Sequence, residues 1–121
     1  MSYNNFAWLL ALKYNQGKDA LENVDNAINL AGSLPDYLDT RGVIYLNLKK
    51  TQDAIKDLQS AVEADPSPPK LFHLAQAYLQ ANNRERATYY WKDAVEKKLP
   101  GGLHPLEQSA YQKVLGQLGT P

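Results

Sequence analysis

The sequence contains no cysteine and only two histidines, His73 and His104. Without cysteine, neither a disulfide framework nor a thiolate-ligated metal centre can form. Neither histidine belongs to the His-Glu-x-x-His spacing that is typical of a catalytic zinc site. The pair Gly101 and Gly102 follows no predicted strand, so it does not resemble a phosphate-binding loop. We therefore predict no catalytic residues, no metal and no cofactor, and we expect that the chain is not an enzyme.

An excess of charge of either sign is also missing, since 13 basic residues balance 13 acidic ones. A net charge of zero supplies no long-range attraction to phosphate backbones or to anionic lipid. The longest apolar run, residues 6–12, is far shorter than the roughly 20 residues that cross a bilayer. We therefore predict no nucleic-acid partner and no membrane partner. The compartment stays open, with the cytoplasm slightly favoured over the periplasm, because a chain without cysteine tolerates both.

Alanines return along the sequence at a nearly constant interval. Ala20, Ala54 and Ala87 are separated by 34 and 33 residues. Within each unit, the apolar residues of the second helical pattern follow the spacing of one helix face. Such a period predicts an all-α fold of stacked helical hairpins, in which small residues let neighbouring helices approach closely. Further positions keep the same interval, in three sets: Ala27, Ala61 and Ala94; Val24, Leu58 and Trp91; Ala7, Gly42 and Ala75.

The order of small and large side chains over residues 4–100 resembles the tetratricopeptide repeat family. The resemblance implies three helix-turn-helix repeats, stacked as a right-handed α-solenoid, with a seventh helix that caps the array. The sequence departs from the family where Leu38 and Leu71 replace a tryptophan, and where Arg41 replaces the leucine before Gly42. We expect a single domain with repeats at about 2–33, 35–67 and 68–100, followed by a capping helix at 104–118.

The first predicted helix is apolar all round over residues 6–12, and a helix of this kind needs cover on more than one side. One side packs on the helix that follows it. We expect the other side, which carries Trp8 and Leu12, either to meet further repeats of a larger protein or to pair with a second copy. The sequence therefore predicts a fragment of a larger protein, with a homodimer through the N-terminal helix as the alternative.

The resemblance also implies that the first helix of each repeat lines a concave groove. Apolar side chains, amides and two acids on those helices would suit a protein or peptide segment held by apolar pockets and hydrogen bonds. For His73 we expect a hydrogen bond in this groove. The expected groove residues are Trp8, Leu12, Asp36, Asp39, Val43, Asn47, Phe72, His73, Gln76 and Gln80.

The predicted function is non-catalytic protein–protein binding through that groove. The alternative is a structural spacer or a self-association segment of a larger protein whose activity lies outside this chain. Some members of the family clamp acidic chaperone tails with cations on the first helices. We expect no such binding here, because those cations are missing and because Asp36 and Asp39 would repel an acidic tail.

Overall fold

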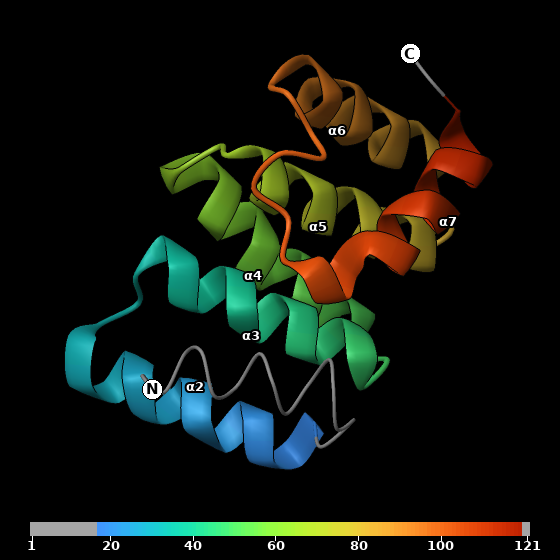
Figure 1. Cartoon of the computed structure of the whole chain (residues 1–121). Helices are drawn as coiled ribbons and strands as arrows, with labels where there is room; N and C mark the ends of the chain where they lie inside the picture. Colours follow the sequence, from blue (N-terminus) through green and yellow to red (C-terminus); the bar gives the residue numbers. More distant parts are fainter. Residues whose placement is uncertain (1–16, 120–121) are drawn as a thin grey trace.

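A computed structural model describes residues 17–119, in which all the regular structure is helical. The all-α fold expected from the sequence is therefore confirmed over this range. Successive helices lie side by side as hairpins and stack into a helical array (Figure 1). The elements are α2 (Gly17–Ala31), α3 (Pro35–Asn47), α4 (Thr51–Ala64), α5 (Pro68–Gln80), α6 (Arg84–Glu96), a 3₁₀ turn η1 (Pro105–Glu107) and α7 (Gln108–Leu118).

The turns inside the second and third hairpins have the same construction. Lys49 and Asn82 both adopt a left-handed backbone, with φ of 62° and 61°. The residue after each of them donates its amide hydrogen to a tyrosine carbonyl five residues back, Tyr45 in one turn and Tyr78 in the other. These bonds satisfy carbonyls that a helix end leaves without partners. The repeated turn explains why α3–α4 and α5–α6 are equivalent hairpins.

Small residues lie where the helices of a hairpin approach each other. Ala54 and Ala87 are fully buried, and Gly42 in α3 leaves no room for a side chain. A Cβ atom placed on Gly42 would lie 2.5 Å from Cγ of Leu58 in α4. The large residues between the small ones fill the interior, since Leu58 and Trp91 are also buried. The repeating alanines therefore occupy equivalent packing positions in these two hairpins.

Arg41 has a structural reason to replace the leucine that the family carries before Gly42. Its guanidinium donates to both carboxylate oxygens of Asp57 in α4, at 2.7 and 3.0 Å, and to Asp25 in α2 at 3.2 Å. The bidentate bond to Asp57 raises the pKa of Arg41 further above its ordinary value, against the opposing effect of burial. One charged side chain thus joins three helices from two successive hairpins.

Helix α7 covers the last hairpin. It lies beside α5 and reaches the end of α6 (Figure 1), and its Val114 is buried in the main core. The Tyr111 ring lies 5.7 Å from that of Trp91, and the Trp91 indole donates to the Gly119 carbonyl at 2.8 Å. Exposed Gln108 and Gln112 mark the outer side of the helix. This arrangement, with one side packed and one side wet, is the one expected of a capping helix.

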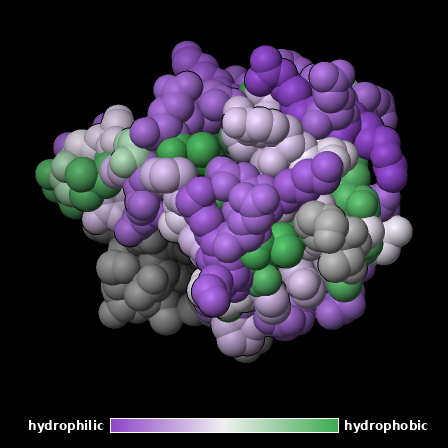
Figure 2. Space-filling view, turned by 90° about the horizontal axis from the view of Figure 1, so that it is seen from above, coloured by the Kyte–Doolittle hydropathy of each residue, from purple (hydrophilic) through white to green (hydrophobic). Residues whose placement is uncertain are grey.

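Hydrophilic residues cover most of the face seen in Figure 2, and the hydrophobic ones form small, separate groups. The large apolar side chains that are exposed among residues 17–119 are scattered singly, a normal feature of water-facing surfaces. None of the helices described is both long and apolar enough to cross a membrane.

Candidate binding cleft

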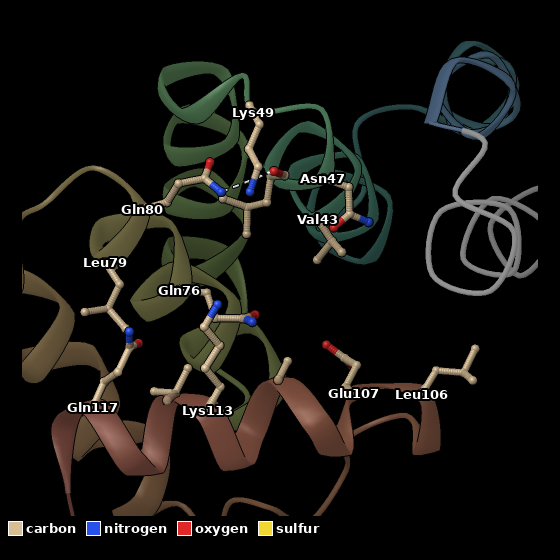
Figure 3. A pocket seen from close by; sticks show the side chains of 13 residues that line it. Val43, Asn47, Lys49, Gln76, Leu79, Gln80, Leu106, Glu107, Lys113 and Gln117 are labelled. Carbon is tan, nitrogen blue, oxygen red and sulfur yellow. Dashed lines mark hydrogen bonds between the residues drawn. The ribbon is translucent and has the colours of Figure 1, made fainter.

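A cleft of about 410 Å³ opens between α3, α5 and α7. Figure 3 shows side chains from all three helices pointing toward it. Its lining combines aliphatic side chains, amides, two lysines and one carboxylate. The residues are Val43, Leu46, Asn47, Lys49, Gln76, Leu79, Gln80, Leu106, Glu107, Ala110, Lys113, Val114 and Gln117.

Four of the expected groove residues line this cleft: Val43, Asn47, Gln76 and Gln80. They come from α3 and α5, the first helices of their hairpins. Nearly half of the lining comes instead from η1 and α7, and none of those residues was expected there. The signal was present, because Leu106, Ala110 and Val114 recur at helical spacing. The pattern predicts the side of a capping helix that packs on the last hairpin. In the structure, the same side of η1 and α7 also faces α3 across the cleft.

Gln80 is held in a fixed orientation at one end of the cleft. Its side-chain nitrogen donates to the Leu46 carbonyl at 3.3 Å, the bond drawn as a dashed line in Figure 3. Its side-chain oxygen lies 2.6 Å from the Thr51 hydroxyl, which donates to it. The amide therefore joins the ends of α3 and α4 to α5. Gln80 is therefore ordered before any ligand binds, so binding loses no further conformational entropy at this side chain.

Phe72 is a core residue and does not face open space, contrary to what we expected of a groove residue. Its side chain is fully buried, and its ring lies 6.3 Å from both the Trp91 and the Tyr111 rings. The physical reason is α7, which covers this face of α5. The expectation treated the concave side of α5 as exposed along its whole length.

His73 is also closed off from solvent, between two carboxylates. Its Nδ1 lies 2.7 Å from Asp39 and its Nε2 lies 2.5 Å from Glu107. Each partner is 34 residues away, so α3, α5 and η1 contribute equivalent positions of successive units. Burial lowers the pKa of His73, but the two carboxylates outweigh burial and raise it to about 10. The ring is therefore an imidazolium at neutral pH, and both nitrogens donate.

Asp36 lies outside the cleft lining and has its own cation. Lys70 of α5 donates to Asp36 at 2.6 Å and to Asp65 at 3.1 Å, and its side chain is nearly buried. Asp39 is paired in a similar way with His73, which also contacts Glu107. Each of these cations contacts two carboxylates, so both groups keep a net negative charge, and the expectation that the chain binds no acidic chaperone tail stays a prediction. The exposed charges on the lining are the cations Lys49 and Lys113.

Two expected groove residues, Trp8 and Leu12, lie outside the described residues, as does the predicted dimer contact. Among residues 17–119, no cluster of three or more histidine and carboxylate side chains has a geometry able to hold a metal ion. In the buried group of Asp39, His73 and Glu107, both ring nitrogens of the histidine already bond to carboxylates.

Stacked hairpins whose alternate helices line a concave cleft define an α-helical repeat protein. A family model described as tetratricopeptide repeat matches residues 35–68. The chain is also 32% identical, over 89 residues, to the DnaJ homolog subfamily C member 7 homolog of Schizosaccharomyces pombe. The chain therefore carries a tetratricopeptide repeat, and repeats of this kind form protein–protein interaction modules. The alignment covers 73% of this chain and 18% of that relative, so the chain spans a small part of its length.

Proposed function

We propose that the chain is a non-catalytic scaffold that holds a segment of a partner protein in the cleft between α3, α5 and α7. The observation that supports this proposal most directly is the cleft itself, which lies on the inner side of the array and presents amides from three helices: Asn47, Gln76 and Gln117 among them. Amide side chains both donate and accept hydrogen bonds, so they suit the peptide groups of an extended segment.

The lining indicates a ligand that is bound mainly through polar contacts. Val43, Leu46 and Val114 are more than nine-tenths buried in the free protein, so a ligand would remove little further apolar area from water there. Leu106 is 41% exposed at the mouth of the cleft and can receive one apolar side chain. The exposed Lys49 and Lys113 favour a segment without net positive charge.

A displayed library of random peptides tests the proposal and needs no identified partner. Peptides selected on the intact chain are measured against Gln76→Arg, which fills the cleft with a longer side chain. They are also measured against Gln52→Arg, the same change on the exposed side of α4, outside the cleft. We expect affinity to fall at least tenfold for Gln76→Arg and to stay unchanged for the control. Equal affinity for all three proteins would refute the cleft as the binding site.

The alternative of a spacer or self-association segment stays a prediction. Its self-association form depends on Trp8 and Leu12, which lie outside the described residues. Light scattering over a range of protein concentrations tests the self-association form, and a monomer at the highest concentration would contradict it. Failure to select any peptide on the intact chain would favour the spacer.

A further inference from the structure

The cleft has one wall that is separated from the stacked hairpins by a loop. η1 and α7 follow a segment that contains Pro100, Gly101 and Gly102, and Gly102 has a φ of 87° that favours glycine. The far end of this wall is attached to α6 through the Trp91 indole and the Arg84 guanidinium, which donate to backbone carbonyls of residues 119 and 117. Its near end reaches α5 through Glu107 and His73.

The contact at the near end joins groups that are costly to bury. Glu107 is 5% exposed and Asp39 is 7% exposed, so neither carboxylate can rely on water to stabilise its charge. The protonated ring of His73 can donate to both of them at once. A neutral imidazole has a single N–H, so one of the two buried carboxylates would then face a ring nitrogen that is itself an acceptor.

We propose that His73 is the positioning residue of the cleft: by bridging Asp39 and Glu107 as an imidazolium, it seats η1 and α7 as the third wall. The importance of this wall for binding rests on the proposed function, but its docking does not. Loss of the charge on His73 releases the near end of the wall, and the cleft loses Leu106, Glu107 and Lys113 from its lining.

The charges near His73 come from each of the elements that meet at this point. Lys70, one turn earlier on α5, is held by Asp36 and Asp65 and also interacts electrostatically with Asp39. The His104 ring accepts a hydrogen bond from the backbone of Leu106. These elements carry further charged and titratable groups. They are Asp36, Tyr37, Asp39, Arg41 and Tyr45 on α3, Lys70 and Tyr78 on α5, His104 and Glu107 at η1, and Tyr111 and Lys113 on α7.

The direction of the pH dependence follows from the contact between His73 and Glu107. The pKa of His73 is about 10 in the docked state, and opening removes Glu107 while Asp39 stays beside the ring. A group with a raised pKa stabilises the docked state fully below the lower value, and the stabilisation is lost as the pH rises through the higher one. Docking should therefore weaken as the pH rises toward the docked-state pKa of about 10. Since a single proton is released, the equilibrium constant for opening can rise by at most about tenfold per pH unit.

Cysteine labelling can measure this opening because the sequence has no cysteine of its own. Val114→Cys places a buried thiol on α7, and Val62→Cys places a matched buried thiol on α4. Each protein is treated with excess iodoacetamide between pH 7 and 9.5. Dividing each rate by the rate for the same protein unfolded in urea at the same pH gives the opening constant, whatever the thiol's own titration.

With His73 intact, we expect the opening constant at Val114→Cys to rise by up to about tenfold per pH unit. The constant at Val62→Cys should rise much less. His73→Gln should increase opening at α7 by at least tenfold at pH 7 and remove its pH dependence. Phe72→Leu, a neighbouring core change without a change of charge, should keep the pH dependence even where it destabilises the fold.

Two outcomes would overturn the proposal: equal pH dependence at the two reporter cysteines, or an unchanged pH profile at Val114→Cys in His73→Gln. If His73→Gln does not fold, Glu107→Gln decides instead, because it leaves His73 and Asp39 in place and should flatten the profile. These measurements contain no ligand. A failure of peptide selection therefore refutes the proposed function alone, and a failure of the labelling pattern refutes the role of His73 alone.

Discussion

Two glycines inside helices provide a direct test of the close packing between hairpin partners. Gly42 lies in α3, where a Cβ atom would be 2.5 and 2.6 Å from two side-chain carbons of the buried Leu58. Gly116 lies inside α7, where a Cβ atom would meet nothing within 4 Å. Replacing either by alanine removes the backbone freedom that glycine has in the unfolded chain, which is worth about 1 kcal/mol in a helix.

The two substitutions should therefore have different effects on stability. Gly116→Ala is expected to stabilise the protein by about 1 kcal/mol. Gly42→Ala gains the same term but forces Leu58 from its position, and overpacking of this kind costs about 1–3 kcal/mol. The helix-propensity term cancels in the comparison, so the free energies of unfolding of the two variants should differ by about 1–3 kcal/mol.

Equilibrium urea unfolding followed by circular dichroism at 222 nm measures both variants. A further variant, Gly42→Ala with Leu58→Val, removes one methylene group and should recover part of the loss, so that the two positions are coupled in a double-mutant cycle. If Gly42→Ala stabilises the protein as much as Gly116→Ala does, the close approach of α3 and α4 is not what requires glycine, and the packing argument fails.

Three further substitutions test contacts in the core, each by urea unfolding. Trp91→Ala removes a buried indole and its bond to the Gly119 carbonyl, and should cost about 3–5 kcal/mol. Phe72→Ala should cost a similar 3–5 kcal/mol, roughly, because the ring belongs to the core; a loss below about 1 kcal/mol would contradict that assignment. Asp57→Ala removes the bidentate partner of Arg41 and should cost about 1.5–3 kcal/mol, leaving Asp25 as the exposed remainder of the network.

The hairpins could be predicted from the sequence because the features that build them are local. Small and large residues alternate within each unit, so the pattern can be recognised in a single repeat. The small residues are Gly42, Ala54 and Ala87, and the large ones are Leu58 and Trp91. The turns, the helical faces and the cap follow from neighbours a few residues apart. The packing of Ala54 against the partner helix does not depend on how the units stack.

The polar contacts between units were harder to predict because each depends on the angle at which hairpins stack. His73 meets Asp39 and Glu107, Lys70 meets Asp36, and Gln80 meets the Leu46 carbonyl, each across 34 residues. The period itself is the available signal, because it places these residues at equivalent positions of successive first helices. Aligning the small residues does not show this signal; it emerges only when the charges one period apart are compared.

These contacts limit how much of the concave side remains for a partner. Near the start of α5, the charged side chains are already paired: Lys70 with Asp36, and His73 with Asp39. The ring of Phe72 is covered by α7. The cleft lies toward the other end of α3 and α5, near Gln76, and η1 and α7 supply part of its lining. The proposed role of His73 therefore connects the two features: its contacts with Asp39 and Glu107 hold η1 and α7, and these elements form one wall of the cleft. It follows that substitutions at His73 should alter binding at the cleft without contact with the ligand, and should do so in proportion to the opening of α7.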